Sequence, residues 1–180
     1  MTVNINKVAL GVCDVKLGTL DLGATKGGVE VTIETSTYEV KLDQTGETPA
    51  KEIITGTSVK VKVPMAETDL ARLAQVIPQA QGVVESTVTT GVLVSTGVNI
   101  DLFAEGLELL LHPTGVASGT TDGDFGLFKA AGTANISFTY NTNSERIYEI
   151  EFKGYPDTTH QDANGRPGVF WFGKKPAASP

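Results

Sequence analysis

The stretch VEVTIETSTYEVKLD, residues 29–43, decides the fold class of this chain. Every second residue from 29 to 33 is valine or isoleucine, and the alternation resumes at residue 38 with tyrosine, valine and leucine. Apolar residues at every second position are typical of a β-strand that buries one face and leaves the other in water. The pattern therefore predicts strands over 29–36 and 38–43.

The same alternation recurs further along the chain. Residues 58–64 alternate valine with lysine, and residues 134–140 alternate apolar with polar side chains. Residues 141–144 have the composition of a turn, and residues 148–153 alternate again, which predicts a hairpin. The chain is therefore expected to be mainly β, with mostly antiparallel strands that each have one wet face.

One short α-helix is expected between these strands. Thr68 is a suitable N-cap, and Asp69 suits the positive end of the helix dipole. Leucine and isoleucine then recur at helical spacing until Pro78, which cannot continue a helix. A second short helix is considered at Leu102–Leu107.

Four segments do not follow a clear strand or helix pattern. The segment QTGETPAK, Gln44–Lys51, lies between two strong strands and predicts a protruding loop. Asp157–Gly168 is predicted to be a loop as well, while Gly82–Gly97 fits one strand, two strands or an extended excursion. Residues 174–180 predict a flexible C-terminal tail, which leaves residues 1–173 as a single domain.

Length and charge narrow the classes of function. The chain has 180 residues, with 14 basic against 21 acidic side chains and a net charge of -7. Nucleic-acid binding relies on clustered lysine and arginine, because these release counterions from phosphates, and here the basic residues are scattered. The single cysteine excludes an intrachain disulfide. No stretch approaches about 18 consecutive apolar residues, so we expect no membrane partner.

No motif predicts an enzyme. His112 and His160 lack zinc-ligand spacing, and although Asp157, His160 and Asp162 could hold a metal from one loop, a structural turn is the favoured interpretation. The only tryptophan, Trp171, lies in an apolar run that predicts a terminal core strand and not an exposed platform for sugars. We therefore expect no catalytic residues, no metal and no cofactor.

Five stretches taken together, in their order, resemble the major tail tube protein of long-tailed, non-contractile (siphovirus-type) bacteriophages. They are LGATKGGVEV (22–31), LDQTGETPAKEIITG (42–56), VKVPMAETDLARLAQVIP (61–78), GLELLLHP (106–113) and FTYNTNSERIYEIEFKGYPD (138–157). The resemblance covers most of the chain, its single motifs are loose, and residues 82–102 contribute least to it.

The resemblance implies a fold, an assembly and a location. The expected fold is a tail-tube-like sandwich of two orthogonally packed antiparallel sheets with one flanking short helix. The subunits would form hexameric rings that stack into a hollow tube in the virion tail, after synthesis in the host bacterial cytoplasm. The implied partners are further copies of the chain and the tape-measure and tail terminator proteins. Contact with a neighbouring subunit or ring is implied for Gln44, Thr45, Gly46, Glu47, Thr48, Pro49, Ala50 and Lys51.

Such a tube would give the acidic residues a role. Genomic DNA would pass through the lumen of such a tube without specific binding, and carboxylates on the wall would repel its phosphates within a Debye length of about 8 Å. The candidates for this wall are Glu30, Glu34, Glu39 and Asp43, of which at least two are expected to face the lumen. The alternative is that these carboxylates form a solvated outer face.

Two other functions remain open at the level of sequence. The chain could be the inner-tube protein of a contractile tail or of a type VI secretion-like machine, because those proteins share the fold. It could instead be a glycan-binding β-sandwich module. Filaments in electron microscopy would favour a tube, and hits on a glycan array would favour the module.

Overall fold

The computed structural model describes residues 11–67, 69–117, 119–143 and 145–179. Over these residues the chain is mainly β, with antiparallel sheets and one short helix, as the sequence predicted. No helix in this part of the chain is long and apolar enough to cross a membrane. The elements are β1 (Cys13–Leu17), β2 (Leu20–Asp21), β3 (Glu30–Lys41), β4 (Pro49–Met65), α1 (Leu70–Val76), β5 (Ala80–Glu85), β6 (Val88–Val94), β7 (Leu107–Pro113), β8 (Phe125–Ser137), β9 (Tyr148–Tyr155), β10 (Asp157–Gln161), β11 (Pro167–Gly168) and β12 (Phe170–Phe172).

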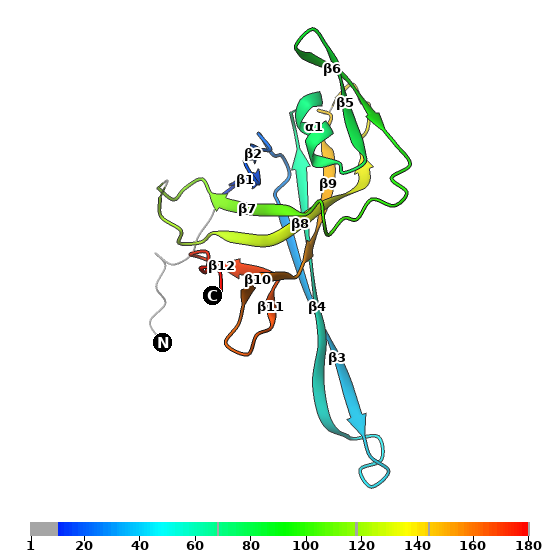
Figure 1. Ribbon diagram of the computed structural model, residues 1–180, viewed down its shortest axis with the longest axis vertical. Helices are drawn as coiled ribbons and strands as arrows, with labels where there is room; N and C mark the ends of the chain where they lie inside the picture. The colour runs from blue at the N-terminus through cyan, green and yellow to red at the C-terminus, as the bar shows by residue number, and fades with distance from the viewer. Residues whose placement is uncertain (1–10, 68, 118, 144, 180) are drawn as a thin grey trace.

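The main sheet has the strand order β2-β1-β7-β8-β9-β4-β3, and β12 pairs with β8 outside this path. β8 joins its two parts: its first residues pair with β7 on one edge and with β12 on the other, and its later residues pair with β9. In Figure 1, β7 and β8 run across the direction of β4 and β9. One hydrogen-bonded sheet therefore forms both layers that enclose the core. One layer contains β7 and the start of β8, and the other contains β9 and β4 (Figure 1).

The core lies between these two layers. Val61 and Phe152 of β4 and β9 pack in one cluster with Leu109 and Leu127 of β7 and β8, and all four are fully buried. Val61 and Phe152 are inward members of the alternations that predicted half-wet strands. Burying side chains of this size stabilises the fold by roughly 1.5–3 kcal/mol each.

The helix differs in detail from its prediction. The N-cap is Asp69, whose carboxylate accepts hydrogen bonds from the backbone N–H groups of Ala71 at 2.9 Å and Arg72 at 3.4 Å. Thr68, the predicted N-cap, lies outside the described residues. The helix packs on β5 and β6, which pair with each other to form a hairpin. The open segment Gly82–Gly97 therefore contributes to two strands.

Two local predictions are wrong. Leu102–Leu107 is not a second helix: the Asp101 carboxylate accepts from the Phe103 N–H at 2.9 Å in a turn, and β7 begins at Leu107. Asp157–Gly168 is not only a loop, because its ends pair as β10 and β11. The turn between them is held by Asp162, whose carboxylate accepts from two backbone N–H groups further along.

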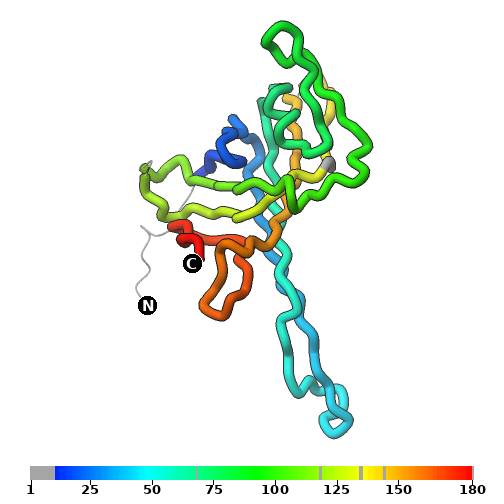
Figure 2. Tube along the Cα trace, in the orientation of Figure 1, coloured from blue at the N-terminus to red at the C-terminus, as the bar shows by residue number. Residues whose placement is uncertain are grey.

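The C-terminal residues lie against this small hairpin (Figure 2). Trp171 of β12 is buried, as predicted for a terminal core strand, and its ring covers Gly126 so closely that a Cβ there would be 2.1 Å away. Beyond β12, the Ser179 N–H donates to the Thr159 carbonyl at 2.8 Å, and Lys175 forms an ion pair with Glu108. The segment predicted to be a flexible tail thus makes specific contacts through residue 179.

Candidate assembly surfaces

The most exposed element of the molecule is a two-stranded arm formed by residues 34–57, which comprise most of β3, the tip and the first half of β4. It projects from the body at the end opposite the β5–β6 hairpin (Figures 1 and 2). Val40, the most covered of these residues, is still only half-buried, and the other side chains are exposed. The arm therefore adds almost nothing to the core.

The arm also leaves backbone hydrogen-bonding groups without partners. Over the described residues β3 pairs only with β4, and β4 pairs with β9 only from Lys60 onward. Both long edges of the arm are thus free along their length. A free row of N–H and C=O groups on an exposed strand is a template for pairing with another chain.

The two strands predicted over 29–36 and 38–43 are one continuous strand, β3. The irregularities lie in its partner. Ser36 pairs with Gly56 and Thr37 with Ile54, which leaves Thr55 as an extra residue in β4, and the shift between Val40 and Lys41 leaves Ala50 as a second one. Since β3 itself continues without a break, its even-numbered residues all lie on one face. The apolar residues of β3 are at odd positions up to Ile33 and at even positions from Tyr38 onward. They therefore lie on one face of β3 before the Thr55 bulge and on the other face beyond it.

This geometry separates the four carboxylates proposed to face a lumen. Glu30 and Glu34 lie on the same face of β3, while Glu39 lies on the opposite face because it is at an odd position. Asp43 is not in a strand but in the tip. Only Glu30 and Glu34 therefore share a strand face.

The tip is shorter than predicted and is held by its own contacts. Pro49, Ala50 and Lys51 belong to β4, so the turn comprises residues 42–48 and includes only 44–48 of the predicted Gln44–Lys51 loop. Lys41 pairs with Glu47 at 2.8 Å across the base of the turn, and the Thr45 hydroxyl donates to the Leu42 carbonyl at 3.1 Å. Gly46 has φ 60°, a conformation that favours glycine.

The register places two pairs of like charges directly opposite each other. Glu39 of β3 faces Glu52 of β4 in the arm, and Lys60 of β4 faces Lys153 of β9 in the body. All four side chains are exposed. The sequence does not predict these pairs, because the offset between two strands is set by the bulges and the tip and not by either strand alone.

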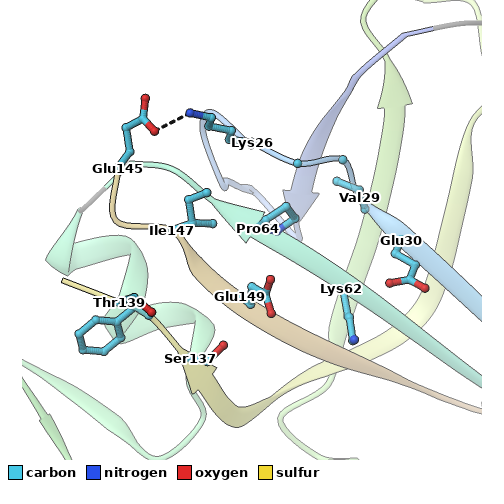
Figure 3. Close-up of a pocket in the computed structure, with 13 residues that line it drawn as sticks. Lys26, Val29, Glu30, Lys62, Pro64, Ser137, Thr139, Glu145, Ile147 and Glu149 are labelled. Atoms are coloured by element: carbon cyan, nitrogen blue, oxygen red, sulfur yellow. Dashed lines mark hydrogen bonds and ion pairs between the residues drawn. The ribbon is translucent and has the colours of Figure 1, made fainter. Parts of the chain in front are cut away.

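The face of β3, β4 and β9 that carries Glu30, Lys62 and Glu149 points away from the core and is called the wet face. A groove of about 720 Å³ lies on this face near the start of β3 (Figure 3). Lys26 and Glu145 pair at 2.5 Å at its rim, and this hydrogen bond lowers the pKa of Glu145. Lys62 lies between the carboxylates of Glu30 and Glu149 in the groove lining (Figure 3). The groove therefore has alternating charges of both signs and does not concentrate negative charge.

Both histidines take part in carboxylate contacts. His112 Nδ1 lies 2.6 Å from Asp124, which is buried, and His160 Nδ1 lies 2.7 Å from Asp157. Asp162, the third member of the considered metal set, instead holds the β10–β11 turn. Within the described residues no group of three His, Cys, Asp or Glu side chains is placed to hold a metal ion.

Burial and hydrogen bonding act in opposite directions on Asp157. Burial raises the pKa of its carboxyl group, but hydrogen bonds from the Thr159 hydroxyl, from His160 and from the Thr159 N–H outweigh burial and lower the pKa to about 2. The His160 ring stacks on Phe128 with centroids 4.4 Å apart. This cluster attaches the β10–β11 hairpin to β8.

The structure therefore offers an exposed arm, free strand edges and a face of mixed charge as surfaces for contact. No family model and no curated protein matches this chain.

Proposed function

We propose that this chain is the structural subunit of a phage tail tube, in which copies form stacked hexameric rings around a lumen that DNA crosses without specific binding. The observation that carries the proposal is the 12-residue edge strand β3, most of which lies in an arm that is exposed in the single chain. A monomer gains little from such an arm and risks aggregation through it. A closed ring uses the same edge for pairing.

The sequence resemblance and the exposed arm both support the proposal. The resemblance implies contact through the region that forms the tip, and the tip is the point of the arm most distant from the body (Figure 1). Pairing around a ring is cyclic and closed, whereas contact between rings along the axis is head-to-tail and open-ended. An arm that projects beyond its own body is suited to the second kind of contact.

The burial of Trp171 weighs against the glycan-binding alternative. Sugar platforms use exposed aromatic rings, whereas Trp171 is 5% exposed and packs on Phe128 at 4.6 Å between ring centroids. Its ring is therefore occupied within the core. Among the exposed aromatic residues, Tyr38 lies on β3 and Tyr140 lies in the segment after β8, where its ring packs on Phe138 and not on Trp171.

Negative-stain electron microscopy of the purified full chain tests the proposal. We expect rings, and at higher protein concentration hollow tubes with an axial repeat. A glycan array probed with the same preparation should show no binding. A chain that remains monomeric at about 1 mM, or one that binds glycans and forms no rings, would contradict the proposal.

A further inference from the structure

Two exposed pairs of like charge lie on this chain, and their signs are opposite. Glu39 and Glu52 are cross-strand neighbours in the arm, and Lys60 and Lys153 are cross-strand neighbours in the body. Side chains directly opposite each other in an antiparallel ladder have Cβ atoms about 4.5–5.5 Å apart, so like charges there destabilise the pairing. Each pair is therefore unfavourable in an isolated copy.

Neighbouring groups compensate these charges only in part. None of the four residues forms an ion pair within 4.0 Å among the described residues. Thr32 lies opposite Lys60 on its other side, and Ala131 lies opposite Lys153. The carboxylates nearest to Lys60 along the ladder, those of Glu30, Glu34 and Glu151, are its diagonal neighbours at roughly 7–8 Å.

The acidic pair has one basic neighbour on its face of the arm. This is Lys41, which is already paired with Glu47.

The acidic pair and the basic pair of one chain do not meet. Glu52 and Lys60 lie on the same strand, β4, eight residues apart. At about 3.3 Å per residue this separates the pairs by roughly 25 Å, and the strand is held extended by its ladder with β3. Attraction between the pairs consequently requires a second copy of the chain.

We propose that the arm of one copy docks on the wet face of a second copy, with Glu39 and Glu52 placed against Lys60 and Lys153. Each pair consists of two residues directly opposite each other on neighbouring strands, so two carboxylates can meet two ammonium groups one to one. The contact converts two repulsions within each chain into attractions between chains. It deepens the proposed function by assigning the partner and the receiving surface of the arm.

The side chains around the acidic pair fit this contact. Ile54 lies on the same face of the arm as Glu52, two residues along β4, and it is 68% exposed. On the receiving face Tyr155 follows Lys153 on β9 by two residues and is half-buried. An apolar contact beside the charges would exclude water and strengthen the ion pairs.

Charge exchange tests the contact in the full-length chain. E39K/E52K gives a chain with basic groups on both surfaces, and K60E/K153E gives a chain with acidic groups on both. Each variant alone should associate at least about tenfold more weakly than the wild type in sedimentation equilibrium. An equimolar mixture of the two variants should recover association, because each arm then meets a face of opposite charge. The quadruple variant should also recover it.

Three outcomes would overturn the docking proposal: variants that associate like the wild type, a mixture that does not recover, or a wild-type chain that shows no association at about 1 mM. A loss of duplex DNA binding in K60E/K153E with unchanged self-association would assign the lysines to nucleic acid instead.

E85K, at an exposed residue of β5, is the matched control and should behave as wild type. Recovery by the mixture without hollow tubes would support the docking and contradict the tube.

Discussion

At the scale of single residues, the clearest stabilising cluster outside the apolar core is the one around Asp157. Its carboxylate receives hydrogen bonds from Thr159 and contacts His160, which stacks on Phe128. Both Asp157 and His160 have side chains that are only 14% exposed. The sequence indicated a polar loop here, because its residues are typical of turns and show no alternation. The ring contact that orders the hairpin comes from β8, about 30 residues away, and local patterns do not contain it.

Asp157 predicts a specific dependence of stability on pH. Because the pKa of this carboxyl falls from its ordinary 3.8 to about 2 in the folded chain, its contribution is complete above about pH 4 and is lost as pH falls toward 2. Asp157→Asn should lower the free energy of unfolding at pH 7 by about 1 kcal/mol after allowance for solvent screening, and should flatten its change between pH 4 and 2. Urea denaturation across this range measures both effects, with Asp122→Asn at an exposed turn as the control. An unchanged pH profile would contradict the assignment.

At the scale of elements, the arm shows where prediction from sequence succeeds and where it ends. The alternation in residues 29–43 correctly predicted extended structure, and the change of phase near residue 36 was visible. The phase change was interpreted as a break between two strands, whereas the structure accommodates it with Thr55 as an extra residue in β4. A single strand does not report the register of its partner. Faces and like-charge pairs therefore followed only from the structure.

Shortening the arm should separate folding from assembly. Replacing residues 38–53 by an Asn-Gly turn removes exposed side chains and leaves the paired, buried portion of β4, including Val59 and Val61, intact. We expect the unfolding midpoint to change by less than about 3 °C, because surface changes cost within about 0.5 kcal/mol. Rings or tubes should be lost in electron microscopy.

The control for this truncation keeps the arm and removes one charge from an exposed bend of the body, with Glu105→Gln. That change should leave both stability and assembly intact, since substitutions of exposed residues change stability by about 0.5 kcal/mol or less. A truncated chain that still forms tubes of normal length would show that the arm is not the element that joins copies.

At the scale of the whole molecule, the net charge of -7 is unevenly distributed. The arm has five carboxylates against two lysines, whereas the wet face of β4 and β9 has two carboxylates, Glu149 and Glu151, against three lysines, Lys60, Lys62 and Lys153. The resemblance and the carboxylates between Glu30 and Asp43 predict an acidic lumen, but the sequence does not show which lysines of neighbouring strands lie beside these carboxylates. Glu30 faces Lys62 across the ladder, so any repulsion of DNA by this face depends on a small excess of carboxylates.

Because carboxylates outnumber lysines on this face only slightly, removing the charges of Glu30 and Glu34 should weaken the repulsion between the face and DNA. Both are exposed on one face of β3, and neither is part of the Glu39–Glu52 pair. If this face lines the lumen, E30Q/E34Q removes two carboxylates from it on every subunit of every ring and so lowers the repulsion of phosphates, and tubes of wild-type length should retain more DNA than wild-type tubes. Co-sedimentation of preformed tubes with short duplex DNA at about 50 mM salt measures the effect, which should disappear near 0.5 M salt. E85Q, away from this face, should bind no more DNA than wild type. Tubes of E30Q/E34Q that still exclude DNA would place these carboxylates on the outer wall.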